Sequence, residues 1–274
     1  MSKGRILFVT QEITPYLKES HMANIGRFLP QGIQETGKEI RTFMPRFGNI
    51  NERRNQLHEV IRLSGMNLII NDQDHPLIIK VASIQSARMQ IYFIDNEDYF
   101  QRKAVFADKN NIFYGDNDER VIFFSRGVIE TVKKLSWSPE IIHCHGWMTS
   151  LIPLYIKKAV KDNPLFTDTK VVISLYDDDF KETMNKDFAT KIKLPGIIAK
   201  DTKQYKTPTY VNVMKAAIDN SDGIIIGSET INKELLAYAQ NSGKPILAFQ
   251  SKEKYVAAYA KFYDEILITE AVVS

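Results

Sequence analysis

This 274-residue sequence has one cysteine, no long hydrophobic run and no large excess of one charge. The single cysteine, Cys144, excludes an internal disulfide, as is usual in a reducing compartment. No segment approaches the roughly 20 consecutive apolar residues that span a bilayer, and residues 1–10 lack the apolar core of a signal peptide. We therefore expect a cytoplasmic protein with no membrane partner.

The charges are nearly balanced. Lys and Arg total 36 and Asp and Glu total 33, which gives a net charge of +3, and the two signs are interspersed along the chain. A nucleic-acid partner is therefore not expected, because such proteins concentrate their basic residues. The hydrophobic content of 44% allows a large core, either as one α/β domain or as two small ones.

The recurring pattern is a buried strand followed by a polar turn and a helix. Residues 5–10 form an apolar, β-branched run typical of a parallel sheet, and Gly37 ends the helix that follows. Similar apolar runs begin near residues 139, 170 and 222. These repeats predict an α/β fold with a Rossmann-like, doubly wound, mostly parallel sheet, in which ligands bind at the carboxyl ends of the strands.

Two segments depart from this pattern. Residues 177–209 are highly charged with little net charge, which fits either a solvated loop with a short helix or a mobile lid. Residues 57–94 contain short β-prone runs without helical periodicity, which predicts an antiparallel excursion at the sheet edge. These runs are residues 57–63, 68–70, 77–83 and 89–94.

The final segment, residues 251–274, contains an amphipathic helix. Its apolar side chains recur at helical spacing and form one stripe, while its charged side chains fall largely elsewhere. Two alternatives are open, namely that this helix packs back on residues 1–250 or that it pairs two protomers. The stripe consists of Tyr255, Ala258, Tyr259, Phe262 and Ile266.

Motifs along residues 5–240 resemble those of bacterial glycogen synthases and plant starch synthases. The turn after the first strand is similar to their E-x-x-P-[YF]-x-K pattern, and M-P-R-F-G at residues 44–48 is near their M-P-R-Y-G. Residues 93–102 and 114–126 resemble synthase stretches closely. The run P-E-I-I-H-C-H-G-W at residues 139–147 is similar to their P-D-x-x-H-x-H-D-W.

The resemblance implies the GT-B architecture, in which two Rossmann-like domains enclose the active site. Residues 1–250 correspond to the acceptor-side domain, residues 251–274 to a helix that crosses back, and we expect the nucleotide-binding domain to be missing. The implied ligands are an α-glucan and a nucleotide sugar, with ADP-glucose as donor if the chain is active. A separate protein chain supplying the second domain is a further possible partner.

The resemblance and the strand-end rule together select candidate ligand-binding residues. Departures from the synthase motifs leave no residue assigned as catalytic. Gly146 stands where the synthases have aspartate, and Tyr176 and Asp177 stand where they have the His-Asn pair that faces the sugar and the donor. The ligand-binding candidates are Glu12, Lys18, His21, Asp95, His145, Trp147, Tyr176, Asp177 and Ser228.

The synthases' glycine pair is also absent, since Glu19, Ser20 and His21 occupy the place of Thr-Gly-Gly. Ser20 and His21 would cost roughly 1–2 kcal/mol each if held in a left-handed conformation. An inward-pointing Glu19 carboxylate about 4 Å from a phosphate would cost on the order of 4 kcal/mol. We therefore expect a degenerate domain that transfers no glucose by itself.

Three functions stay open: a non-enzymatic protein that binds glucan, a small ligand or a partner; one half of a split glycogen synthase; or an unrelated activity on this scaffold. The run of aspartates at residues 177–179 could hold Mg²⁺, although such runs more often form solvated turns. His143 and His145 share a strand face but have no third metal ligand at a suitable spacing, so neither a metal nor a cofactor is predicted.

Overall fold

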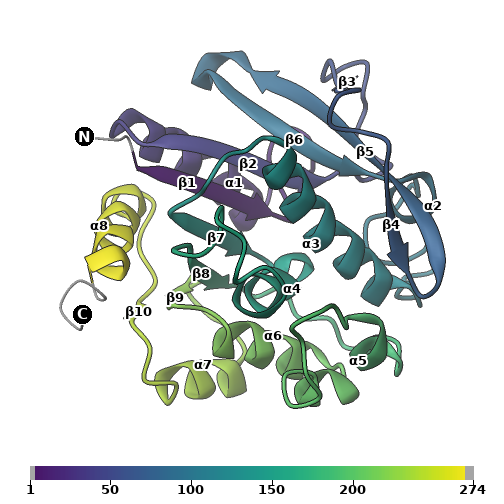
Figure 1. Ribbon diagram of the computed structural model, residues 1–274. Helices are drawn as coiled ribbons and strands as arrows, with labels where there is room; N and C mark the ends of the chain where they lie inside the picture. The colour runs from purple at the N-terminus through teal and green to yellow at the C-terminus, as the bar shows by residue number, and fades with distance from the viewer. Residues whose placement is uncertain (1–3, 269–274) are drawn as a thin grey trace.

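A twisted sheet runs through the computed structural model, which describes residues 4–268 (Figure 1). The strands lie in the order β10-β9-β8-β7-β1-β2-β6-β5-β3, and β4 pairs with β5. Their bounds are β1 (Arg5–Thr10), β2 (Glu39–Pro45), β3 (His58–Glu59), β4 (Met66–Ile70), β5 (Gln73–Ile84), β6 (Met89–Asp95), β7 (Ile141–His145), β8 (Lys170–Leu175), β9 (Gly223–Ile226) and β10 (Ile246–Leu247).

Helices connect the strands and cover the sheet. The α-helices are α1 (His21–Glu35), α2 (Glu97–Phe100), α3 (Asn117–Lys134), α4 (Leu151–Leu154), α5 (Phe188–Lys191), α6 (Tyr210–Asp219), α7 (Lys233–Gln240) and α8 (Tyr255–Ile268). Short turns of other helix types are η1 (Gln85–Ala87), η2 (Trp147–Thr149), η3 (Tyr155–Ala159) and η4 (Lys203–Lys206).

All pairs from β10 through β6 are parallel, which confirms the doubly wound, mostly parallel sheet. The strand β1 lies between β2 and β7. From β1 the chain builds outward through β2 and β6, and it later returns to build the other half from β7. This reversal leaves a crevice between the carboxyl ends of β1 and β7, where ligands of such sheets bind.

Alternation along β1 divides the core into two layers. Ile6 and Phe8 pack with residues of α1 and α8 on one face. Leu7 and Val9 belong to the larger layer on the opposite face, which includes α3, α4 and α6. Figure 1 shows α3, α4 and α6 together on one side of the sheet and α8 away from them. Burial on both faces explains why the strands are almost wholly apolar.

The antiparallel excursion is confirmed, with two corrections. The strands β3 and β4 both pair antiparallel with β5, and β5 pairs antiparallel with β6. However, β6 also pairs parallel with β2, so it is part of the main sheet. The expected strand at residues 57–63 is mostly turn, with only the short β3 in its place. Whether a strand pairs parallel or antiparallel depends on the strand beside it, and the periodicity of its own residues does not identify that neighbouring strand.

The C-terminal helix α8 packs back on its own domain. Its buried side chains lie against α1 and against residues of β1, β7, β8 and β9. The approach to α1 is close, because a Cβ atom added to Gly32 would lie 2.6 Å from Val256 Cγ1. The last residues of the predicted segment, 269–274, lie outside the described residues. The side chains that α8 buries are Tyr255, Tyr259, Phe262, Tyr263 and Ile266.

The charged segment 177–209 contains the short helices α5 and η4. It is tied to the body of the domain by Lys191, whose Nζ lies 2.9 Å from Asp118 Oδ2 and 2.7 Å from Glu119 Oε1 on α3. The Lys191 side chain is only 7% exposed, so these ion pairs are shielded from solvent. Movement of the rest of the segment as a lid stays a prediction.

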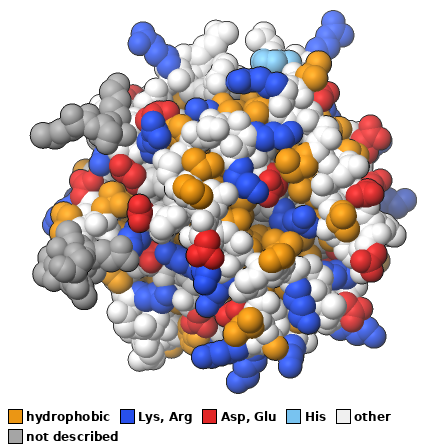
Figure 2. All heavy atoms as spheres, viewed as in Figure 1, with side chains coloured by type: hydrophobic (Ala, Val, Ile, Leu, Met, Phe, Trp, Pro, Cys, Tyr) orange, Lys and Arg blue, Asp and Glu red, His pale blue; other side chains and the backbone are white. Residues whose placement is uncertain are grey.

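The surface carries no concentration of one charge on the face shown in Figure 2, where basic and acidic side chains are intermixed. Within residues 4–268, no helix combines the length and the apolar character needed to cross a membrane.

Candidate functional site

A cavity of about 420 Å³ lies at the carboxyl ends of β1, β7, β8 and β9, in the crevice expected for this topology. We call it the strand-end cavity. The N-terminus of α1 and the loop between α2 and α3 complete its wall. Its lining residues are Gln11, Glu12, Ser20, His21, Met22, Phe106, Phe113, Trp147, Tyr176, Asp177, Asp178, Asp179, Phe180 and Ser228.

Most of the candidate ligand-binding residues lie at this cavity. The three that do not line it are Lys18, Asp95 and His145. Lys18 is exposed on the turn before α1, and His145 is buried behind the Tyr176 ring, to whose hydroxyl it is hydrogen-bonded. The residues that do line it are Glu12, His21, Trp147, Tyr176, Asp177 and Ser228.

Asp95 instead belongs to a buried ion-pair cluster at the end of β6. Lys80 Nζ lies 2.9 Å from Asp95 Oδ2 and 2.6 Å from Glu52 Oε1, and Arg46 also approaches both carboxylates. Burial raises the pKa of the Asp95 carboxyl despite the neighbouring Lys80. This carboxylate therefore serves to neutralise buried cations, which is a structural role.

The start of α1 corrects the expectation for the missing glycine pair. Ser20 is the N-cap residue with φ of −142°, and its Oγ accepts a hydrogen bond from Ala23 N at 3.0 Å. Neither Ser20 nor His21 has a positive φ, so the expected left-handed strain is absent. Glu19 is exposed and accepts a hydrogen bond from Asn24 Nδ2 at 3.0 Å. It therefore does not point into the strand-end cavity.

His21 links the two halves of the site. Its Nε2 lies 2.8 Å from Gly227 O, and because a carbonyl can only accept, Nε2 carries the proton. Glu12 lies on the same side of the cavity, and its Oε2 accepts a hydrogen bond from Ser20 Oγ at 2.6 Å. The N-terminus of α1 is thus joined to the ends of β1 and β9.

The lining combines carboxylates with aromatic rings. Trp147 is at the centre of the rings, with centroid separations of 4.7 Å to Phe106 and 5.1 Å to Phe180. Phe113 stacks on Phe180 at 5.0 Å. Among the lining residues, His21 is the only one that can carry a positive charge, and none is Lys or Arg. The cavity is therefore suited to a neutral ligand with apolar faces and hydroxyl groups, and poorly suited to phosphates.

Both strand histidines are buried in a polar network rather than arranged around a metal. Tyr263 of α8 lies 2.6 Å from His143 Nδ1, and His143 Nε2 lies 2.7 Å from Ser174 Oγ. His145 Nδ1 lies 2.7 Å from the Tyr176 hydroxyl. Within residues 4–268, no group of three His, Cys, Asp or Glu side chains is placed to hold a metal ion. This network connects α8 to the wall of the strand-end cavity.

Burial lowers the pKa of both histidines, and that of His145 falls to about 3. The unfolded chain, with a histidine pKa near 6.5, therefore binds protons between about pH 6.5 and pH 3 that the folded chain does not. The stability that neutral His145 contributes is present above about pH 6.5 and is lost as the pH falls.

For the variant His145→Asn, which keeps a polar atom near the Tyr176 hydroxyl, we expect the part of the pH dependence that comes from His145 to disappear, while the part from His143 stays. The stability difference between wild type and variant should then shrink by about 1.4 kcal/mol per pH unit between pH 6 and pH 4. Urea unfolding at several pH values measures it. The exposed His58, replaced in His58→Asn, is the matched control and should give a constant difference. A constant difference for His145→Asn as well would contradict a depressed pKa at this position.

Several lining residues were not identified as ligand-binding candidates from the sequence: Asp178, Asp179, Phe106, Phe113 and Phe180. The aspartates were considered only as a magnesium site. In the structure, Asp178 and Asp179 bond to different partners, which are Tyr210 and Asn232. Phe106 and Phe113 lie in an irregular loop, where the sequence has no periodicity from which the direction of a side chain could be predicted. For Asp178, its position three residues beyond the last residue of β8 was an available signal.

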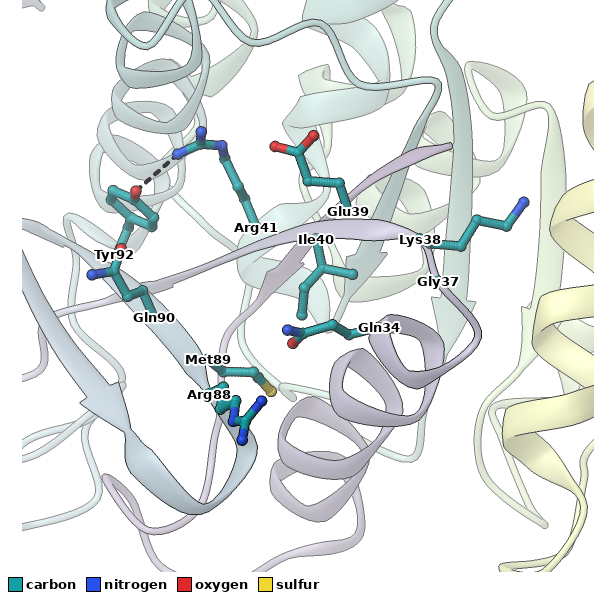
Figure 3. A pocket seen from close by; sticks show the side chains of 10 residues that line it. All are labelled: Gln34, Gly37, Lys38, Glu39, Ile40, Arg41, Arg88, Met89, Gln90 and Tyr92. Atoms are coloured by element: carbon teal, nitrogen blue, oxygen red, sulfur yellow. Dashed lines mark hydrogen bonds between the residues drawn. The ribbon is translucent and has the colours of Figure 1, made fainter. Parts of the chain in front are cut away.

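A second cavity, of about 480 Å³, lies at the amino ends of β2 and β6 (Figure 3). Two of its charged groups are already engaged, because Lys38 Nζ bonds Asp264 and Arg41 donates to the Tyr92 hydroxyl, both at 2.9 Å. Figure 3 shows Lys38 and Arg41 pointing away from each other. Because its charged side chains do not converge on one point, we place the candidate site at the strand-end cavity.

Comparison with known proteins identifies the family. The sequence model of a protein family, the starch synthase catalytic domain, matches residues 5–246. A glycogen synthase of Chlorobium luteolum is 33% identical over 236 residues, covering 85% of this chain and 47% of that protein. A glycogen synthase of Chlorobium limicola is 40% identical over 175 residues, covering 63% of this chain and 35% of that protein.

The solved catalytic domain of starch synthase IV from Arabidopsis thaliana, bound to ADP and acarbose, has the same fold, with a TM-score of 0.71 at 16% identity. The match covers 91% of this chain and 52% of that one. This chain spans between about a third and about half the length of these relatives. With the family match extending over most of its residues, the chain belongs to the starch synthase catalytic domain family of glycogen and starch synthases.

Proposed function

We propose that this domain binds an α-glucan in the strand-end cavity and does not itself transfer glucose from ADP-glucose. The observation that carries the proposal is the lining of the cavity, where aromatic rings and carboxylates are combined and no Lys or Arg is present. Glucose units offer apolar ring faces to aromatic side chains and hydroxyl groups to carboxylates. A diphosphate would instead meet repulsion of about 4 kcal/mol from each carboxylate near 4 Å.

The expected loss of transfer rests on three positions. Tyr176 and Asp177 stand where the synthases have His-Asn, and Gly146 stands where they have aspartate. The Tyr176 phenol has a pKa raised well above its usual range by burial, so it stays neutral and hydrogen-bonded to His145. It cannot serve as an imidazole does, donating at one nitrogen and accepting at the other near neutral pH.

Calorimetric titration tests the proposal. We expect maltohexaose to bind with a Kd below about 1 mM, and ADP and ADP-glucose to show no binding in the same range. In Phe113→Ala, which removes a ring of the cavity, maltohexaose binding should weaken several-fold. Phe28→Ala removes a ring that is 48% exposed and lies outside the cavity, so it should have no effect. Absence of maltohexaose binding, or tight ADP-glucose binding, would overturn the proposal.

The alternative is one half of a two-chain glycogen synthase. It is favoured by the 33% identity to a Chlorobium luteolum glycogen synthase of which this chain covers only 47%. The experiment is to add, as a separate polypeptide, the part of that relative beyond the match and to assay glucosyl transfer from ADP-glucose to maltohexaose. Transfer that requires both polypeptides would establish the alternative and exclude a purely binding role.

A further inference from the structure

Position 146 has no free space for a side chain in this fold. Gly146 has φ of +83°, and a Cβ atom added there would lie 2.4 Å from Gln11 Cδ. The Gln11 side chain is fixed, since it is 1% exposed and its Oε1 accepts a hydrogen bond from Met148 N at 3.1 Å. The space next to position 146, in the crevice between β1 and β7, is therefore filled by Gln11.

A carboxyl group from the loop after the neighbouring strand β8 reaches the next residue, Trp147. Asp178, which follows β8, accepts a hydrogen bond at Oδ2 from the backbone N–H of Trp147 at 3.1 Å. Its Oδ1 accepts a hydrogen bond from the Tyr210 hydroxyl at 2.6 Å. Asp178 is thus held beside the residue that directly follows Gly146, and it lines the strand-end cavity.

The two neighbouring aspartates are placed differently. The Asp179 side chain is exposed and its Oδ2 accepts a hydrogen bond from Asn232 Nδ2 at 2.7 Å. Asp177 is also exposed, and its contact with Ser228 Oγ is made by its backbone N–H. Of the three, Asp178 alone is half-buried with a hydrogen-bond donor on each carboxylate oxygen. Its orientation is therefore fixed before any ligand arrives, which reduces the entropy lost on binding.

We propose that Asp178 supplies the carboxyl group that holds the hydroxyls of the bound sugar, in place of a side chain at position 146. This inference rests on the proposed glucan binding. Each carboxylate oxygen has two acceptor sites, and the bonds from Trp147 N and the Tyr210 hydroxyl occupy one on each. The remaining acceptor sites are available to two sugar hydroxyls. Adjacent hydroxyls of a glucose unit can donate to one carboxylate in this way.

Isosteric substitution tests the inference. Asp178→Asn can keep its two internal bonds, because its oxygen can accept from Trp147 N while its nitrogen donates to the Tyr210 hydroxyl. Loss of the charged acceptor should weaken maltohexaose binding about 10- to 100-fold in calorimetry. Asp168→Asn, at an exposed aspartate that does not line the strand-end cavity, is the matched control and should change the affinity by less than about 2-fold. Thermal unfolding of both variants verifies that they are folded.

A second variant tests the inference even if Asp178→Asn does not fold. Tyr210→Phe leaves the Asp178 carboxylate in place but removes the donor to its Oδ1, so binding should weaken by a smaller factor, about 3- to 10-fold. Wild-type affinity in Asp178→Asn, or equal losses in Asp178→Asn and Asp168→Asn, would overturn this inference alone. Failure of the wild type to bind maltohexaose would overturn the proposed function and this inference together.

Discussion

Truncation after Gln250 is expected to produce a protein that melts at a much lower temperature than the full chain or aggregates. The truncation removes α8, which buries five large side chains against α1 and the sheet. At about 2 kcal/mol for each side chain taken out of water, this packing contributes roughly 10 kcal/mol before ordering costs. That is comparable with the whole net stability of a typical domain, which is about 5–15 kcal/mol.

Loss of α8 also removes a polar partner from the core. The Tyr263 hydroxyl lies 2.6 Å from His143 Nδ1, and without it this nitrogen would be buried unpaired or exposed to water. The apolar face of α1 would be uncovered as well, because Ile25, Leu29 and Ile33 share the α8 layer. We therefore expect aggregation on heating, with a much lower melting temperature or no cooperative transition.

Truncation after Ile268 is the matched control, since it leaves every residue of α8 in place. It should melt as the full chain does. Circular dichroism melts at low protein concentration, together with size-exclusion chromatography, distinguish the outcomes. A chain truncated after Gln250 that melts like the full-length protein would show that α8 does not hold the domain together.

Gly146→Asp is expected to destabilise the protein by about 2–5 kcal/mol. This substitution introduces the residue found at the same place in the synthase motif. The left-handed backbone with φ of +83° costs a side chain about 1–2 kcal/mol, and overlap of the new Cβ with Gln11 adds about 1–3 kcal/mol. Introducing the motif residue therefore requires Gln11 or the backbone to move, because the space is already occupied.

Two alanine variants separate the causes of this loss. Gly146→Ala carries both the backbone strain and the overlap with Gln11, whereas Gly37→Ala has φ of +95° with nothing within 4 Å of the added Cβ. Urea unfolding should therefore show a larger loss for Gly146→Ala than for Gly37→Ala. The double variant Gln11→Ala with Gly146→Ala should recover part of the difference. Equal stability of Gly146→Asp and wild type would show that Gln11 moves aside freely.

The parallel sheet and its order of elements could be predicted from the sequence because buried strands are continuous apolar runs. The run at residues 5–10 is β1, and the pattern after Asn117 is the long helix α3. The predictions failed where partners decide the structure. The β-prone residues 89–94 predict a strand but not its partners. In the structure this strand runs parallel to β2 on one side and antiparallel to β5 on the other.

For the site, strand ends were enough to predict Glu12, Trp147, Tyr176 and Ser228, since parallel strands bring their carboxyl ends to one edge. Which groups point into the cavity was decided only by the tertiary structure. Gln11 reaches Met148 across 137 positions of the chain, and Asp178 takes its direction from Tyr210, 32 positions away. Such directions are set by rotamers that distant partners stabilise, and no local pattern of residues encodes a partner's position.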